Sequence, residues 1–164
     1  MTFDEFRQRL VAVALVCAAA FGAPSLAAEP AITHAQPTLH MEPLQVVTHR
    51  GVFSFQVEIA ATPRQQNVGL MFRPPLAANR GMLFEFGSPQ QVSFWMKNCP
   101  HPIDMLFIQA DGTILSIANA QPNSETPIGS GGPITGVLEI RGGRASEIDA
   151  EPGDTVRHRF FHHG

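Results

Sequence analysis

Two neighbouring residues carry the clearest sign of recognition chemistry in this sequence. Lys97 is the one lysine among 11 basic residues, and every other cation is an arginine. A chain that otherwise uses arginine has a local need for a compact ammonium group at this position. Trp95, the one tryptophan, is two residues away, so both side chains would share one face of a strand. The pair predicts a surface that binds an anionic or hydroxyl-rich ligand, or a partner. The alternative is a tryptophan that covers an ordinary sheet face beside a solvated lysine.

Two carboxylates stand in otherwise apolar runs. Asp104 and Glu139 each interrupt a hydrophobic segment, and a buried charge without a partner is costly. Lys97 and Arg73 are the natural partners for Asp104, although a structural ion pair would explain it equally well. Arg73 follows a predicted helix end, on a connection of the kind that often carries binding groups. The candidate ligand-binding residues are therefore Arg73, Trp95, Lys97, Asn98, Asp104 and Glu139.

This set supports two classes of function. The first is a binding domain without catalytic activity. The second is an enzyme that uses Lys97, Asp104 and Arg73 as charge-stabilising or acid–base groups, in which case Lys97 would sit in a desolvated pocket.

The Cys99-Pro100-His101 sequence places a thiol and an imidazole too close along the chain for easy proton transfer. We expect Cys99 to be a small buried hydrophobe.

Other kinds of site are not predicted. The histidines lack the His-x-His spacing, followed by a glutamate, that metal-binding jelly rolls use, so we expect no metal and no cofactor. The sequence contains no phosphate-binding loop and no dinucleotide fingerprint. The net charge of −3 argues against nucleic-acid binding by bulk electrostatics.

Short strands must position these residues. Hydrophobic alternation predicts a hairpin from 44–48 and 52–59, followed by strands at 82–86, 92–97, 103–108, 114–120, 137–140 and 155–161. In strand 92–97, Phe94 and Met96 would face the core, opposite Trp95 and Lys97. Asp111-Gly112 predicts a tight turn, and 121–132 predicts a loop. The 14 glycines and 14 prolines fit a turn-rich fold that is mainly β, either a sandwich or a distorted barrel.

One short helix is predicted near 63–68. Thr62 is a good N-cap, Pro63 suits the first helical position, and Gln65 completes a capping box. Gly69 is then the natural end of the helix.

The N-terminus is typical of a bacterial secretory signal. Arg7 and Arg9 precede an apolar run over 10–21, and Ser25-Leu26-Ala27 has the form of a cleavage site. We expect a signal peptide at 1–27, a flexible leader at 28–43 and a single domain at 44–164. The mature protein would then be periplasmic or secreted, with no membrane span. An uncleaved N-terminal anchor is the alternative.

An ordered set of motifs resembles the family called domain of unknown function 192. The motifs are Gly69-Leu70-Met71-Phe72-Arg73, Gly81-Met82-Leu83-Phe84-Glu85-Phe86, Phe94-Trp95-Met96-Lys97-Asn98, Pro102-Ile103-Asp104-Met105, Phe107-Ile108, Asp111-Gly112, Pro122 and Val137-Leu138-Glu139. The resemblance covers about 44–161 and implies a mainly β sandwich of jelly-roll type. It implies no activity, because none is established for the family. Cys99 and His101 stand where the family more often has threonine and an aliphatic residue, which argues against a catalytic role for either.

Overall fold

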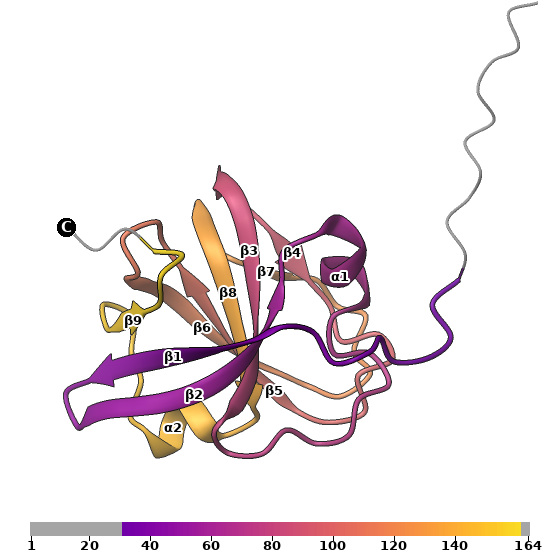
Figure 1. Cartoon of the computed structure of the whole chain (residues 1–164), viewed down its shortest axis with the longest axis horizontal. Coiled ribbons are helices and arrows are strands. Elements are labelled where there is room, and N and C mark those ends of the chain that lie inside the picture. Colours follow the sequence, from indigo (N-terminus) through magenta and orange to yellow (C-terminus); the bar gives the residue numbers. More distant parts are fainter. Residues whose placement is uncertain (1–30, 162–164) are drawn as a thin grey trace, which may run out of the picture. The chain divides into compact units, whose positions relative to one another are not determined.

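A curled seven-stranded sheet forms the body of the protein (Figure 1). The computed structural model describes residues 31–161, and the expected signal peptide lies outside the described residues. Within that part, the elements in chain order are β1 (Met41–Thr48), β2 (Gly51–Ala60), α1 (Pro63–Val68), β3 (Arg80–Gln90), β4 (Ser93–Phe94), β5 (Ile103–Ile108), β6 (Ile114–Ala120), β7 (Ile128–Gly129), β8 (Ile134–Arg141), α2 (Arg144–Glu147) and β9 (Thr155–Arg157).

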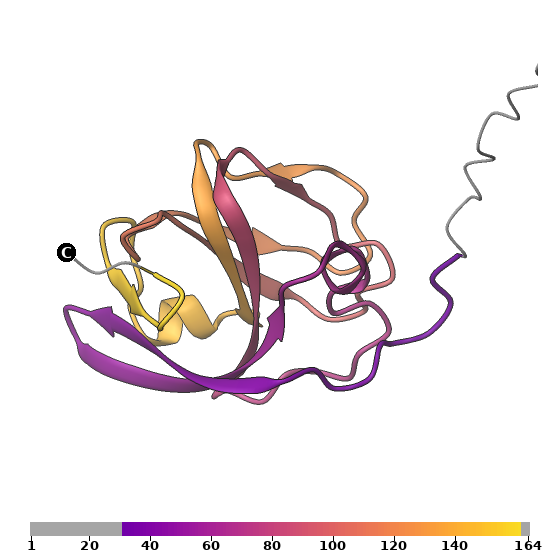
Figure 2. The same cartoon turned by 45° about the horizontal axis from the view of Figure 1, so that its top comes forward.

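The strand order brings distant parts of the chain together. The large sheet runs β6-β5-β8-β3-β2-β1-β9, and β4 pairs with β7 in a separate two-stranded ribbon. Neighbouring strands are antiparallel except β2 and β3, which are parallel. The two edges of the large sheet approach each other at one end, where Thr113 and Thr155 form a bridge and Val156 donates to Gly112. The sheet therefore curls into an incomplete barrel (Figure 2).

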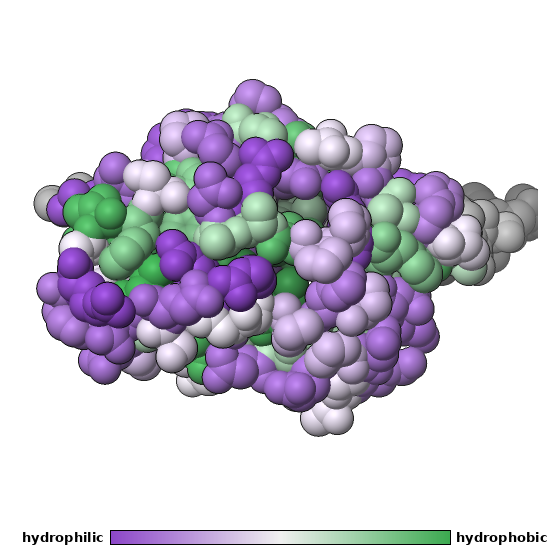
Figure 3. Space-filling view, turned by 90° about the horizontal axis from the view of Figure 1, so that it is seen from below, coloured by the Kyte–Doolittle hydropathy of each residue, from purple (hydrophilic) through white to green (hydrophobic). Residues whose placement is uncertain are grey.

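The sheet buries hydrophobic residues on both faces. Leu106 and Leu138 belong to a core that is also lined by β1, β2, α2 and β9. Met105 and Val137, from the same two strands, belong to a second core, which the segment just after α1 and the loop before β5 cover. Figure 1 shows these elements on opposite sides of β3 and β8. Double-sided burial explains why Ile103–Ile108 is buried throughout. From below, most of the surface is hydrophilic, with hydrophobic residues recessed between polar ones (Figure 3).

The mainly β class is confirmed, but the jelly-roll sandwich is not, since both cores lie against one curled sheet. The strands at 103–108 and 114–120 are found with the predicted bounds. The hairpin at 44–59 is also found, although β1 begins earlier, at Met41. The strand expected at 155–161 ends at Arg157. Neither α2 nor β7 was predicted from the sequence.

The helix is confirmed with its predicted bounds. Thr62 accepts a hydrogen bond from the Gln65 amide at 3.3 Å, and the Gln65 side chain accepts one from the Thr62 amide at 3.0 Å. Pro63 occupies the first turn, and Gly69 ends the helix with φ of 48°. A capping box of this kind satisfies two amide groups that a helix start leaves open. It can therefore define a helix of only six residues.

The segment expected to be a flexible leader is attached to the domain from residue 32 onward. Ile32 and Leu39 pack against the second core, and the Leu39 amide donates to Glu58 at 2.7 Å. The Gln36 side chain donates to the carbonyl oxygens of Gln65 and Gly69, at 3.1 and 3.0 Å. Contacts with the domain therefore begin before Leu44, and sequence periodicity does not register hydrogen bonds made by an irregular segment.

Candidate functional site

The Trp95–Lys97 pair lies at the surface, on a loop between β4 and β5. The Lys97 Nζ atom is 5.2 Å from the centroid of the Trp95 ring, within the range of a cation–π contact. It also lies 3.9 Å from a carboxylate oxygen of Glu125. Trp95 is 48% exposed and the Lys97 side chain 44% exposed. The structure thus brings together the two residues that the sequence singled out.

A loop, rather than a strand, positions this pair. The strand expected at 92–97 ends at Phe94. The Met96 amide instead donates a hydrogen bond to the Ser124 carbonyl oxygen, at 2.7 Å. Met96 is 1% exposed and anchors the loop in the second core, as predicted. Phe94 is only half-buried, with its ring edge-on to Phe84 and Phe107.

Two residues other than glycine have positive φ where this loop meets the 70–77 loop. Asn98 has φ of 57° and Phe72 has φ of 60°, a region that side chains other than glycine seldom adopt. The Phe72 amide donates to the Asn98 carbonyl at 2.8 Å, so the two strained residues join their loops directly. The Asn98 side chain contacts the Met71 sulfur at 3.9 Å. Strained positions of this kind tend to cluster at functional sites.

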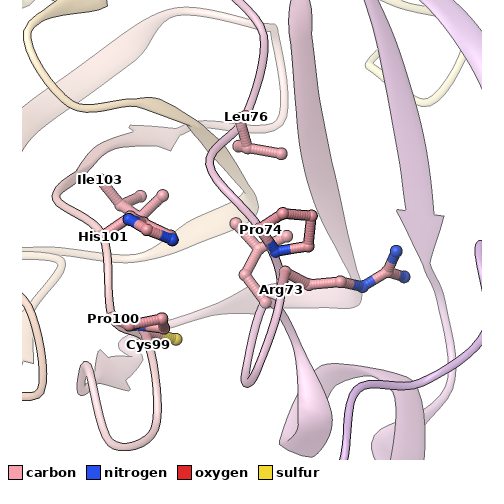
Figure 4. A pocket seen from close by; sticks show the side chains of 8 residues that line it. Arg73, Pro74, Leu76, Cys99, Pro100, His101 and Ile103 are labelled. Atoms are coloured by element: carbon pink, nitrogen blue, oxygen red, sulfur yellow. The ribbon is translucent and has the colours of Figure 1, made fainter.

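Arg73 is held away from the Trp95–Lys97 pair by other partners. Its Nη2 atom donates to Glu58 at 2.9 Å and to the carbonyl of Pro37 at 3.1 Å. In Figure 4 its guanidinium points away from Cys99 and His101. The ion pair is largely shielded from solvent, since the two side chains are 15% and 12% exposed.

The pocket between Arg73 and His101 is small. Figure 4 shows Cys99, Pro100, His101 and Ile103 on one side, and Arg73, Pro74 and Leu76 on the other. Its volume of about 10 Å³ holds about one water molecule. Burial, and secondarily the charge of Glu139, raises the pKa of the Cys99 thiol to about 12. Cys99 is thus the buried hydrophobe that we expected, and its thiol stays protonated and weakly nucleophilic at neutral pH.

The prediction that Asp104 pairs with Lys97 or Arg73 is wrong. The Asp104 side chain is buried on the side of the sheet that α2 covers, where it accepts hydrogen bonds from the Asn119 amide and the backbone of Ala145, both at 2.7 Å. These two bonds satisfy the carboxylate without a cation. The acid–base group of Lys97, Asp104 and Arg73 is therefore not assembled.

Glu139 is buried in β8 among the residues of the second core. It lies opposite Met82 on one side and Met105 on the other. Burial raises the pKa of its carboxyl group to about 8. Among residues 31–161 no hydrogen bond or ion pair is found for this carboxyl group. Glu139 is therefore protonated at neutral pH and does not face the Trp95–Lys97 pair as an anion.

An ionic cluster that was not predicted from the sequence lies where the C-terminal segment meets β1. Arg159 donates to both carboxylate oxygens of Glu42, and His158 Nε2 lies 3.0 Å from one of them. The hydrogen bonds from Arg159 lower the pKa of Glu42, whereas burial raises the pKa of nearby Glu85 and lowers that of His158. Glu42 lies two residues before the buried Leu44 in β1, so both share the inward face, and this two-residue period could have revealed its position.

Other site types receive no support from the described residues. Over 31–161, no group of three or more histidine, cysteine, aspartate or glutamate side chains could hold a metal ion. In the same range, no helix has the length and hydrophobicity needed to cross a bilayer.

Comparisons with known proteins identify a family and similar structures, but none of them comes with an established activity. Residues 45–158 match the family model of domain of unknown function 192, described as an uncharacterized ACR. A crystal structure named as a "putative transcription regulator" from Sinorhizobium meliloti 1021 is 40% identical, with a TM-score of 0.72. The match covers 75% of this chain and 97% of that one.

A second solved structure gives the same result. A protein of unknown function from Novosphingobium aromaticivorans DSM 12444 is 38% identical, with a TM-score of 0.72 over 79% of this chain and 95% of the other. No curated protein matches the chain.

Proposed function

The chain belongs to the domain of unknown function 192 family, and from that premise we propose that it is an exported binding domain without catalytic activity. Its ligand is anionic and rich in hydroxyl groups, such as an acidic oligosaccharide. The observation that carries this proposal is the Lys97 ammonium over the exposed Trp95 ring.

The chemistry of the pair fits that ligand class. An exposed indole offers a flat apolar face on which the C–H side of a sugar ring can stack. The adjacent ammonium group attracts a carboxylate and donates hydrogen bonds to hydroxyl oxygens. Phe72 adds a second exposed aromatic ring, on the loop joined to Asn98. The strained backbone at both loops supports a surface that is built for recognition.

Two other functions have less support. The enzyme alternative required Lys97, Arg73 and Asp104 to act together, but each has a different partner. Nucleic-acid binding would agree with the name of the Sinorhizobium protein. However, the net charge of −3 works against binding to a phosphate backbone.

Export is part of the proposal because the N-terminal sequence has the order of a secretory signal. The mature chain would begin near Ala28. Mass spectrometry of a periplasmic fraction should find the shortened chain, and a full-length cytoplasmic protein would contradict export.

The ligand is tested with a defined probe, an oligomer of uronic acid, beside a neutral oligoglucose of the same length. Calorimetry should show that the uronic acid oligomer binds and that Trp95→Ala and Lys97→Arg each weaken binding by about tenfold. Lys97→Arg keeps the charge but changes the shape of the cation. Val52→Ala removes an exposed hydrophobic side chain elsewhere and serves as the control. Absence of binding to either oligomer, or equal binding by all variants, would refute the proposal.

A further inference from the structure

A second cavity that Arg73 lines is large enough to hold a small molecule. It has a volume of about 240 Å³, whereas the pocket beside Cys99 has a volume of about 10 Å³ and holds about one water molecule. Its walls come from five parts of the chain: the attached leader, the start of β1, β2, the 70–77 loop and the start of β3. We infer that this cavity is a second binding site, specific for a small amphipathic carboxylate.

The charge at the cavity favours an anion. Arg73 and Arg80 both line it, against the single carboxylate of Glu58. Glu58 is already engaged, because one of its oxygens accepts hydrogen bonds from both Arg73 and the Leu39 amide. Arg80 is exposed and forms no ion pair with any residue in 31–161. The cavity therefore has one cation that the protein itself does not neutralise.

Arg73 is held in place and still has unused donors. The contacts to Glu58 and Pro37 involve only its Nη2 atom. Its Nε atom is buried and has no acceptor among the described residues. A guanidinium fixed along one edge loses little side-chain entropy when it binds a carboxylate.

The remaining lining is apolar, which sets the rest of the ligand's chemistry. Apart from Thr38, Gly81 and the charged residues, the wall consists of Met41, Leu70, Pro74, Pro75, Leu76 and Ala77. Such a wall buries a hydrocarbon body, while the arginines hold the charged end. The volume is below the roughly 300–1,000 Å³ of sites for drug-sized molecules, so the ligand is small. A short-chain or medium-chain carboxylate meets all of these conditions.

This site is distinct from the Trp95–Lys97 surface, since the two share no residue and differ in the ligand they fit. Binding at one site can therefore be found or refuted without reference to the other.

Octanoate is the probe that tests the inference, with 1-octanol and octylamine as neutral and cationic analogues of equal chain length. Isotope-edited NMR titration of the folded protein should show octanoate binding, with shifts at the backbone amides of Leu76 and Arg80. Arg80→Gln should weaken binding by about tenfold, because the free cation is lost. Arg64→Gln, an exposed arginine on α1, is the matched control and should bind normally.

A second variant distinguishes binding in the cavity from misfolding of the first variant and from non-specific binding. Leu76→Trp places a larger apolar side chain in the cavity and should block octanoate while leaving the rest of the spectrum unchanged. The inference fails if octanol or octylamine binds as tightly as octanoate, or if Arg80→Gln behaves like Arg64→Gln. It also fails if octanoate causes no shifts at these residues at about 10 mM, a concentration that detects even weak sites.

Discussion

Adjacent residues in this protein can differ sharply in how much their side chains contribute to stability. Trp95 and Met96 are an example. Met96 is buried in the second core, whereas Trp95 is about half exposed. Met96→Ala should lower the free energy of unfolding by about 2–5 kcal/mol, through lost burial and a cavity. Trp95→Ala should cost less than about 1 kcal/mol, because about half of its side chain is already exposed to solvent. Urea denaturation measures both, and the reverse order would mean that the loop is oriented the other way.

The buried carboxyl group of Glu139 predicts a pH dependence of stability. In the unfolded chain it ionises near its ordinary pKa of 4.5, but in the folded protein only near 8. Between these values the folded state binds more protons, so the free energy of unfolding falls as the pH rises through this window. Glu139→Gln imitates the protonated form and removes that slope.

The expected gain from Glu139→Gln at about pH 8 is on the order of 3 kcal/mol, with little difference at about pH 4. Denaturant unfolding across this range is the measurement. Glu125→Gln, at an exposed carboxylate, is the control and should leave the slope unchanged. Parallel stability profiles for wild type and Glu139→Gln would show that this carboxyl group is solvated.

At the scale of elements, the attached leader and α1 depend on each other. The Gln36 side chain donates to the Gln65 carbonyl, which also accepts from the Gly69 amide, and to the Gly69 carbonyl just past the helix. Gln36→Ala should therefore lower the free energy of unfolding by about 1–2 kcal/mol. Thermal unfolding tests this, with Gln121→Ala at an exposed loop position as the control. Equal melting temperatures for the two variants would mean that the leader adds nothing to the domain.

Local sequence signals were enough to predict some elements. The helix at 63–68 was predictable because its start signal and its glycine end lie within eight residues. The strands at 103–108 and 114–120 were predictable because each is a hydrophobic run on either side of an Asp-Gly turn. In each case the determining interactions are close together in the sequence.

Other features depend on contacts between distant residues, and these could not be predicted. The parallel pairing of β2 with β3 and the position of β5 between β6 and β8 arise from tertiary packing. Asp104 bonds to a residue 41 positions away, in a helix of four residues that has no side-chain cap. The Trp95–Lys97 pair was predicted because its two residues are neighbours, although a loop rather than a strand holds them.

At the scale of the whole molecule, the C-terminal segment closes the curled sheet. β9 pairs with β1, and Thr155 forms a bridge to Thr113 near the opposite edge. The Phe161 ring packs against Gly136 so closely that a β-carbon there would lie 2.8 Å from it. Glu42 holds the same segment through His158 and Arg159. This closure joins the first strand to the last described residues.

The ionic part of this closure should fail in acid. Hydrogen bonds from Arg159 lower the pKa of Glu42 below its ordinary 4.5, so the unfolded chain binds a proton there more readily than the folded protein. The resulting stabilisation is fully present above the ordinary pKa of 4.5. It is lost as the pH falls through the lowered pKa of Glu42 in the folded protein. Burial also lowers the pKa of His158, which adds to acid instability in every variant that retains it. Arg159→Gln should therefore reduce the melting temperature most at neutral pH.

The comparison that isolates the Glu42–Arg159 contact is thermal unfolding of wild type, Arg159→Gln and Arg157→Gln at about pH 7 and about pH 3. Arg157 is an exposed residue of β9, and its loss should have little effect at either pH. The difference in melting temperature between wild type and Arg159→Gln should become smaller in acid, because a protonated Glu42 no longer forms an ion pair with the guanidinium. A gap of constant size would mean that Arg159 stabilises the segment by packing alone. In that case the sheet is closed by β9 pairing and Phe161, and the ionic cluster is incidental to it.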